Sequence, residues 1–318
     1  MRVFIFLFVA VLLFFALFIF VVFLIARYLV RVALYRKAPR GAFGEGRLRD
    51  ITGDDRFVDM LYFFEKRLRE RDTDTVEILG CDGIKLVGHF FRVESARRII
   101  IAVHGWRSSW SRDFGVIYDF WQDSESSVLF IEQRAQRGSE GNYITFGILE
   151  RYDLLEWVRW LDENNTEGLP IYLCGVSMGA STVLMSSELP LPDSVHGIIS
   201  DCGFTAPEDI WRHVVNNTLH LHYNLYSRIA NHECKRLTGY GAKDCSTVHA
   251  VSKCKVPVLF IHGTDDTFVP ISMTYDNYKA CASPKRLFVV PGANHGMSYY
   301  VDKGGYETEM QRFWSAYD

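Results

Sequence analysis

A serine between two glycines stands near the middle of the sequence, in the stretch IYLCGVSMGAS that covers residues 171–181. The order G-x-S-x-G, after a short apolar run and before small residues, is typical of a sharp strand-to-helix turn that exposes a serine hydroxyl. The serine backbone in such a turn is strained, and flanking glycines remove side chains that would clash. A serine that only caps a helix requires neither glycine. We therefore predict that Ser177, between Gly175 and Gly179, is a nucleophile.

A serine hydroxyl needs a base to take its proton, so a histidine oriented by a carboxylate should accompany it. For this type of turn the expected chain order is Ser, then Asp or Glu, then His. The stretch FIHGTDDTFVP supplies Asp265 and Asp266 at the end of a predicted strand, and VVPGANHGMSYY supplies His295 after the next strand. These residues predict acyl transfer through Ser177, with either carboxylate as the acid.

Acyl transfer also needs hydrogen-bond donors for the oxyanion of the tetrahedral intermediate. The backbone N–H of Met178, directly after the nucleophile, is one expected donor. The second donor should come from the loop after an earlier strand, where the sequence reads IIIAVHGWRSSW. We expect this loop to lie beside Ser177.

The elements that must position these residues follow from the apolar pattern. Short apolar runs alternate with helical stretches, which implies a mostly parallel sheet covered by helices on both faces. A hairpin around Asp82-Gly83 precedes the alternating part. The predicted strands cover residues 98–104, 127–132, 170–175, 195–200, 257–263 and 286–292.

Residues 204–250 interrupt this alternation, because they contain no obvious strand. They are rich in aromatic side chains and histidines, among them Trp211 and Tyr226. We predict that this interval is a helical lid over the site. An additional helical pair that packs on the core is the alternative.

The first segment is apolar from Val3 to Ala26, without a charged or strongly polar residue. As a helix it would span about 36 Å, against roughly 30 Å of bilayer hydrocarbon. A cleaved signal peptide would have an apolar region of roughly 7–15 residues and a small-residue cleavage site, and the following RYLVRVALYRKAPRG offers no convincing one. We therefore predict an uncleaved anchor at 1–26, a basic linker at 27–57 and a catalytic domain at 58–318.

Charge and cysteine usage indicate the compartment. Only Arg2 and the amino terminus precede the apolar span, whereas five basic residues follow it, so the positive-inside rule places the catalytic domain in the cytoplasm. Seven cysteines without a C-x-x-C pair favour reduced thiols. The net charge is -3, and no basic block in the body suggests a nucleic-acid partner. The five basic residues are Arg27, Arg31, Arg36, Lys37 and Arg40.

Taken together, the motifs make the chain similar to the α/β-hydrolase superfamily of serine hydrolases. Those proteins often carry H-G-x-x-D-x-x-V-P, and HGTDDTFVP matches it with Asp266 in the acid position. The stretch GANH resembles the catalytic-histidine loop and selects His295. IIIAVHGWRSSW resembles the H-G-x oxyanion loop, which implies that the N–H of Trp106 is the second donor. A simple strand-ending turn is the alternative for His104-Gly105.

One further stretch points to a narrower group. IEQRAQRGSEG resembles the D-x-R-A-x-G-x-S-E-G segment of lysophospholipase-like hydrolases. Glu132 stands where Asp is usual, and Arg137 stands where Gly is common. These departures affect a loop near the site, so they concern the shape of the substrate rather than the chemistry. The resemblance covers roughly residues 58–318.

The resemblance implies a membrane-anchored serine hydrolase of the carboxylesterase or lipase type, which cleaves carboxylic esters through an acyl-enzyme. Such an enzyme requires no metal or organic cofactor, and the anchor suits a lipid or other acyl ester. Cleavage of an amide or peptide, acyl transfer to another acceptor, and a catalytically silent binding module stay open. The sequence leaves the physiological substrate and the oligomeric state undetermined. Four residues near the motifs are candidates for an apolar acyl pocket, with ordinary packing as the alternative: Trp110, Trp211, Met297 and Tyr299.

Overall fold

A single eight-stranded sheet lies at the centre of the computed structural model, which describes residues 1–39 and 55–318. The strand order is β1-β2-β4-β3-β5-β6-β7-β8. The pairs β1–β2, which form a hairpin, and β2–β4 are antiparallel. The other neighbouring strands of this sheet pair in parallel. The strands are β1 (Asp74–Leu79), β2 (Lys85–Phe91), β3 (Arg98–Val103), β4 (Ser126–Glu132), β5 (Ile171–Val176), β6 (Val195–Asp201), β7 (Val258–Gly263) and β8 (Lys285–Val290).

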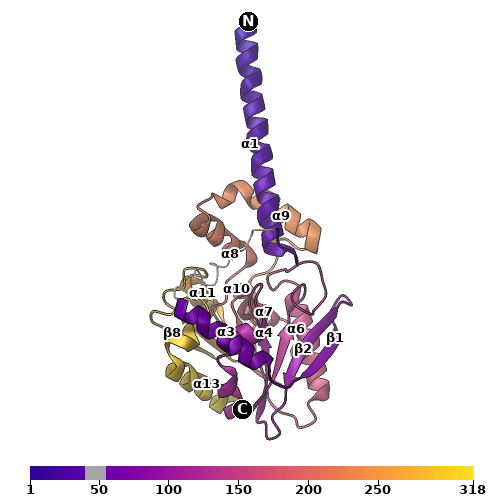
Figure 1. Cartoon of the computed structure of the whole chain (residues 1–318), viewed down its shortest axis with the longest axis vertical. Helices are drawn as coiled ribbons and strands as arrows, with labels where there is room; N and C mark the ends of the chain where they lie inside the picture. Colours follow the sequence, from indigo (N-terminus) through magenta and orange to yellow (C-terminus); the bar gives the residue numbers. More distant parts are fainter. Residues whose placement is uncertain (40–54) are drawn as a thin grey trace.

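Helices cover both faces of this sheet (Figure 1). Successive strand residues point to opposite faces, so Tyr172 belongs to one core cluster and Leu173 to the other. The central strands are buried on both sides, which explains their continuous apolar runs. The predicted α/β-hydrolase architecture is therefore confirmed. The covering helices are α3 (Asp55–Arg69), α4 (Trp110–Phe114), α5 (Tyr118–Asp123), α6 (Glu150–Asn164), α7 (Met178–Ser186), α10 (Thr247–Val251), α11 (Ile271–Ala280), α12 (Ser298–Val301) and α13 (Lys303–Tyr317).

The strand order changes direction at β3, which pairs with β4 on one side and β5 on the other. In open α/β sheets the loops that leave the strands at such a point diverge and form a crevice at their carboxyl ends. The loop after β3 and the turn after β5 therefore meet at one edge of the sheet. These segments contain Trp106 and Ser177.

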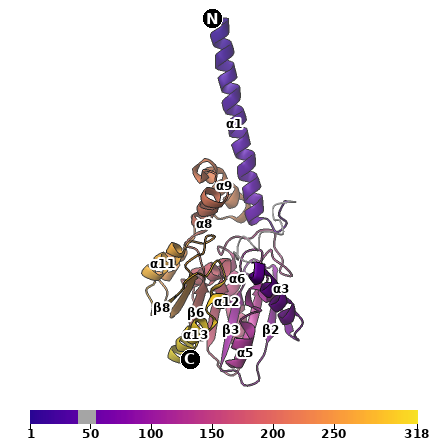
Figure 2. The same cartoon turned by 60° about the vertical axis from the view of Figure 1, so that its left-hand side comes forward.

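Residues 204–250, all within the described part of the chain, are helical and contain no strand. They include α8 (Pro207–His213), the π-helical turn η1 (Val214–Thr218) and α9 (Tyr223–Thr238). In both overall views α8 and α9 lie over the same end of the sheet as the base of α1 (Figure 2). This insertion therefore covers the edge where the strand-end loops meet.

The N-terminal helix α1 (Arg2–Leu34) is longer than the predicted anchor. Residues 27–34, which the sequence assigned to a linker, continue the helix because Pro and Gly first occur at Pro39 and Gly41. The middle of that predicted linker, residues 40–54, lies outside the described residues. Residues 1–21 are exposed, and α1 is long and apolar enough to cross a membrane. A buried stripe at every fourth position then begins: Val22, Ala26, Val30 and Leu34.

Candidate active site

Ser177 occupies the turn between β5 and α7, with φ 56° and ψ −118°. This left-handed φ is strained for a serine, and the surrounding backbone maintains it. The Ser177 N–H donates to the Asp201 carbonyl at 2.9 Å, and the Ser177 carbonyl accepts from the N–H of Ser181 at 3.0 Å. A Cβ on Gly175 would lie 2.3 Å from the backbone of Gly179, and one on Gly179 would lie 1.9 Å from the Val103 carbonyl oxygen. Both glycines are therefore required for this turn.

The predicted base and acid form a hydrogen-bonded series with the serine. His295 Nε2 is 2.9 Å from Ser177 Oγ, and His295 Nδ1 is 2.7 Å from Asp266 Oδ2. All three side chains are buried, although they come from the loops after β5, β7 and β8. With the ring proton on Nδ1, Nε2 is an acceptor for the serine proton.

Asp266 is held by four hydrogen bonds. Its Oδ1 accepts the N–H groups of Phe268 at 2.9 Å and Val269 at 2.8 Å, and its Oδ2 accepts from His295 and His262. Burial opposes ionisation of this carboxyl, but the charges and hydrogen bonds of both histidines outweigh it and hold the pKa of Asp266 well below its usual range. Asp266 is therefore a fixed anion at neutral pH.

The neighbouring Asp265 is in a different environment. Its side chain is exposed, and it accepts a hydrogen bond from the hydroxyl of Thr264 at 2.7 Å. Of the two candidate acids, the structure brings Asp266 to His295.

The structure adds a residue, His262, that the sequence analysis does not single out. His262, fully buried, places Nε2 3.0 Å from Asp266 Oδ2 and 2.9 Å from the Val269 carbonyl. Both partners only accept, so Nε2 carries the proton, and Nδ1 accepts from the Thr274 hydroxyl at 2.7 Å. His262 thereby supports the carboxylate behind His295. Its only sequence signal is its position as the first letter of the HGTDD motif.

The loop after β3 lies next to the serine, as predicted. Gly105 N–H donates to Asp113 Oδ2 at 2.7 Å, and Arg107 N–H donates to Gln136 Oε1 at 2.6 Å, so the backbone is fixed on both sides of Trp106. On the other side of the serine, Met178 begins α7, where a backbone N–H has no carbonyl one turn earlier to donate to. This arrangement is consistent with the two predicted oxyanion donors.

His104 supports the same loop from the protein interior. It is fully buried, its Nδ1 lies 2.8 Å from the Gly105 carbonyl, and its Nε2 accepts the N–H of Gln133 at 3.2 Å. Burial lowers the pKa of His104, although the carboxylate of Asp113 acts in the opposite direction. His104 is thus a neutral structural support rather than a second base.

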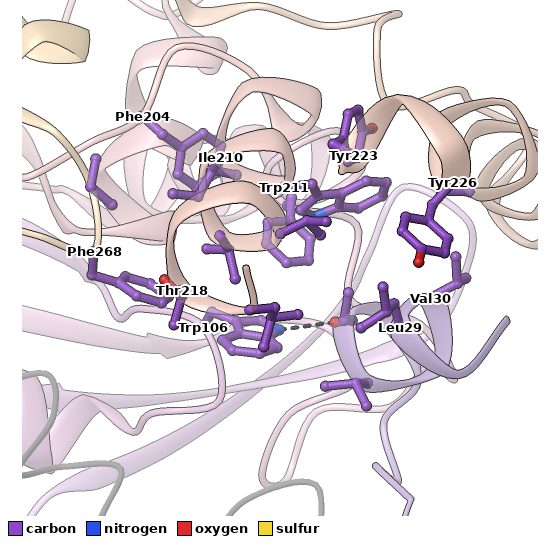
Figure 3. A pocket seen from close by; sticks show the side chains of 18 of the residues that line it. Leu29, Val30, Trp106, Phe204, Ile210, Trp211, Thr218, Tyr223, Tyr226 and Phe268 are labelled. Atoms are coloured by element: carbon purple, nitrogen blue, oxygen red, sulfur yellow. Dashed lines mark hydrogen bonds between the residues drawn. The ribbon is translucent and has the colours of Figure 1, made fainter. Parts of the chain in front are cut away.

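Ser177 and Met178 line an apolar cavity of about 590 Å³. Figure 3 shows part of its wall, with Trp106, Trp211 and Phe268 among the labelled side chains. Trp211, one of the four predicted pocket residues, lines it. The other three lie elsewhere: Trp110 packs against His89 and Phe130, Tyr299 donates a hydrogen bond to Glu307, and Met297 is buried beside the histidine loop. Nearness to a motif in sequence was a poor guide, because these side chains point into the packed interior.

The cavity walls come from segments that are distant in sequence. Phe268, whose ring centroid lies 5.0 Å from that of His295, forms part of the wall next to the base. Sequence reasoning missed this residue, although the matched HGTDDTFVP motif contains it. The sequence did not indicate the other wall residues outside the predicted lid, which are Ala26, Tyr28, Leu29, Val30, Val32, Ala33, Phe146, Thr267 and Val269. The remaining wall residues belong to the interval 204–250 that the sequence predicts as a lid: Phe204, Ile210, Val214, Val215, Thr218, Leu219, Tyr223, Tyr226 and Ala230.

One group of potential metal ligands coincides with the site. Atoms of Cys202, Asp266 and His295 lie within 4.8 Å of one another. Burial raises the pKa of the Cys202 thiol well above its usual range, and only a thiolate is a good ligand. Both His295 nitrogens already face Ser177 and Asp266. This chemistry suits proton transfer better than metal binding.

Comparison with known proteins gives a family match over about half of the chain. Residues 146–317 match the profile of the prolyl oligopeptidase family, peptidase S9. An uncharacterized protein of Bacillus subtilis strain 168, YqkD, is 32% identical over 192 residues, which are 59% of this chain and 61% of that relative. The aligned part therefore spans less than two thirds of that relative. YfhR of Escherichia coli strain K12 is 21% identical over 267 residues, 80% of this chain and 86% of YfhR.

Solved structures share the fold at low sequence identity. An esterase of Pyrococcus furiosus, Pf2001, has a TM-score of 0.64 at 22% identity, with 77% of this chain and 91% of that chain covered. A dienelactone hydrolase of Anabaena variabilis has a TM-score of 0.52 at 19% identity, with 77% and 96% covered. A putative dipeptidyl aminopeptidase IV of Bacteroides ovatus has a TM-score of 0.58 at 17% identity, with 78% and 36% covered. The fold thus accommodates esterases and peptidases alike.

Proposed function

The chain belongs to the prolyl oligopeptidase family of α/β-hydrolases, and we propose that it is a membrane-anchored serine hydrolase that cleaves carboxylic esters. The hydrogen-bonded series Ser177, His295 and Asp266 at the end of an apolar cavity carries the proposal. A serine hydroxyl beside an accepting imidazole nitrogen is the requirement for an activated nucleophile.

The proposed reaction has two steps. In the first, His295 Nε2 takes the Ser177 proton while Oγ attacks the carbonyl carbon, and His295 then protonates the leaving alcohol. In the second, His295 deprotonates a water molecule, which attacks the acyl carbon. The bond between that carbon and Ser177 Oγ then breaks, His295 returns the proton to Oγ, and the acid leaves. The N–H groups of Met178 and Trp106 stabilise the oxyanion in both steps, and Asp266 holds the imidazole in the correct tautomer and stabilises its charged form.

The shape of the site supports an ester with an apolar acyl group. The cavity next to Ser177 is lined mainly by aliphatic and aromatic side chains. A polypeptide carries an N–H and a carbonyl at nearly every residue, and burying them without partners is costly. An apolar acyl chain needs no such partners. The family match nevertheless makes amide or peptide cleavage the second candidate.

The anchor completes the proposal. Residues 2–21 of α1 are exposed and rise roughly 30 Å, which equals the hydrocarbon thickness of a bilayer. Arg27 and Arg31 follow this stretch, and Lys37 lies shortly beyond. By the positive-inside rule, the proposed orientation has the catalytic domain on the cytoplasmic side. Residues 204–250 are the proposed lid of this domain.

Labelling by a fluorophosphonate probe tests the nucleophile, with the full-length protein in detergent because α1 lines the cavity. We expect one adduct by intact mass, its loss in Ser177→Ala and much slower labelling in His295→Ala. Ser181→Ala is a matched control, since Ser181 lies within α7 and its hydroxyl donates to the Phe204 carbonyl. A folded parent that does not label, or a Ser177→Ala variant that still does, would refute the proposal.

Paired substrates separate the two candidate reactions. Butyrate and hexanoate esters of 4-nitrophenol would be compared with the matching 4-nitroanilides, which differ only in the bond cleaved. Ester hydrolysis that depends on Ser177 supports the proposed function. Faster cleavage of the anilides would make the protein an amidase, and faster cleavage of a proline-containing dipeptide anilide would make it a peptidase.

A further inference from the structure

The cavity at Ser177 is built partly from the proposed membrane anchor. Leu29, Val30 and Ala33 of α1 line it together with Trp211 and Tyr226 of the insertion. Figure 3 shows Leu29 and Val30 on the same side of the cavity as Tyr226. We propose that residues 26–33 of α1 are a wall of an acyl-binding site that receives the acyl chain of an ester lipid directly from the bilayer. This inference rests on the proposed hydrolase function and gives it a substrate class.

The helix is fixed in place by side-chain packing. Val22 and Ala26 share a buried cluster with Val215, Tyr223 and Tyr226 of the insertion. Because the buried residues recur every fourth position, they form one stripe along α1 that faces α9. The anchor and the insertion therefore form one packed unit, and the cavity lies between them.

Hydrogen bonds connect the same end of α1 to the proposed oxyanion loop. Trp106 Nε1 donates to the Ala33 carbonyl at 2.9 Å, the contact drawn as a dashed line in Figure 3. The guanidinium of Arg107 donates to the carbonyls of Val32 at 2.9 Å and Arg36 at 3.1 Å, and also to Tyr35. The last carbonyls of a helix lack intrahelical partners and attract positive charge, so these bonds stabilise both segments. The wall thus has a definite position relative to Ser177.

The position of the cavity along α1 indicates where the acyl chain comes from. Exposed apolar residues occupy α1 up to Val21, and packing on the insertion begins at Val22. When the exposed stretch spans the hydrocarbon, the cavity wall at 26–33 lies directly at the membrane surface. The insertion also exposes Leu219 and Leu225, which are 43% and 48% accessible. Both overall views show the insertion beside the base of α1 (Figures 1 and 2).

The chemistry of the path favours a lipid over a soluble ester. An acyl chain that moves from the hydrocarbon into this cavity exchanges one apolar environment for another, whereas a long chain in water must first leave lipid or micelle. Only the ester group has to reach the polar atoms around Ser177. A single-chain or double-chain ester lipid fits this path.

A bulky substitution on the cavity wall tests the proposal. Leu29→Trp adds volume to a wall residue, and Leu24→Trp makes the same change on an exposed face of the same helix that does not line the cavity. Full-length variants would be reconstituted in phosphatidylcholine nanodiscs and assayed with 4-methylumbelliferyl oleate and butyrate, which share one leaving group. With monomeric ester in water as the reference, each methylene excluded from the cavity costs about fourfold in binding, so exclusion of two lowers the oleate-to-butyrate ratio of kcat/KM by about sixteenfold.

The outcomes distinguish this inference from the proposed function. A lower ratio in Leu29→Trp and a parental ratio in Leu24→Trp support it. If Leu29→Trp does not fold, Leu29→Phe serves, with Leu24→Phe as its control. Equal ratios in folded, active variants overturn the acyl-site proposal while leaving the hydrolase intact. Failure of every variant, including the parent, to react with fluorophosphonate overturns the proposed function instead.

A second arm tests the source of the lipid. The oleate ester would be placed either in the same nanodiscs as the enzyme or in separate protein-free vesicles of the same composition. Uptake from the bilayer requires faster initial hydrolysis when enzyme and ester share a disc. Equal initial rates in both arrangements would refute direct uptake and indicate a chain taken from solution.

Discussion

Replacing Asp266 by Asn changes the proposed triad with little change in shape. Oδ1 accepts the N–H groups of Phe268 at 2.9 Å and Val269 at 2.8 Å, and Oδ2 accepts from His295 at 2.7 Å. The two backbone donors require an oxygen, so they orient the new amide with its NH₂ group toward His295. The NH₂ group donates to Nδ1, and the ring proton moves to Nε2. His295 then faces the serine as a donor.

The consequence for catalysis can be given a magnitude. With its proton on Nε2, His295 cannot accept the Ser177 proton across the 2.9 Å contact. The corresponding change in another Ser-His-Asp enzyme lowers kcat by about 10⁴, and that factor corresponds to about 5 kcal/mol of transition-state stabilisation. We expect Asp266→Asn to lower kcat for a butyrate ester by the same order. His262 keeps its bond to the Val269 carbonyl, so the fold is retained.

Asp265→Asn provides the matched control, because it makes the same chemical change at an exposed neighbour. The assay measures kcat of both full-length variants, with thermal unfolding as the check on folding. We expect the control to keep kcat within about twofold of the parent, since surface substitutions usually have small effects. A loss of less than about tenfold in a folded Asp266→Asn protein would contradict the tautomer mechanism. A comparable loss in Asp265→Asn would mean that the acid has been assigned to the wrong carboxyl.

Three further predictions concern the same site. Burial opposes the charged form of His295, but the carboxylate of Asp266 outweighs it and raises the pKa of His295 above its ordinary 6.5. Since the base must be neutral, kcat/KM should fall as the pH drops, with a midpoint above 6.5 in the parent and a lower midpoint in Asp266→Asn. A parental midpoint below 6.5 would refute this prediction. Gly179→Ala places a Cβ 1.9 Å from a carbonyl oxygen, so we expect urea unfolding to show a destabilisation of about 3 kcal/mol or more. The control Gly304→Ala should change stability little, because its added Cβ would have no atom within 4 Å. Equal stabilities of the two variants would show that the turn can relax. Arg107→Lys keeps the charge but loses the fork that reaches the carbonyls of Val32 in α1 and of Arg36 just after it. We therefore expect kcat to fall with KM for a butyrate ester nearly constant, and a change confined to KM would contradict a positioning role for this loop.

The sequence determined the features that depend on neighbouring residues. The turn at Ser177 needs one glycine two residues before the serine and another two residues after it, so five consecutive residues contain the whole requirement. The hairpin at Asp82-Gly83 and the apolar runs of the parallel strands are equally local, and the structure has them within one or two residues of the predicted ends. The order of the motifs along the chain then indicated the family's fold.

Tertiary structure alone decided what surrounds the serine. Whether an aromatic residue near a motif faces the cavity depends on contacts that are distant in sequence, so Trp211 lines it while Trp110 and Tyr299 belong to the core. The pairing of His262 with Asp266 depends on how the loop after β7 folds back on its own strand. The apolar pattern of α1 is the same for a helix that only anchors and for one that also forms a cavity wall. That second role appears only where Leu29 and Ala33 meet the insertion and the loop of Trp106, because packing between remote segments leaves no local trace in the sequence.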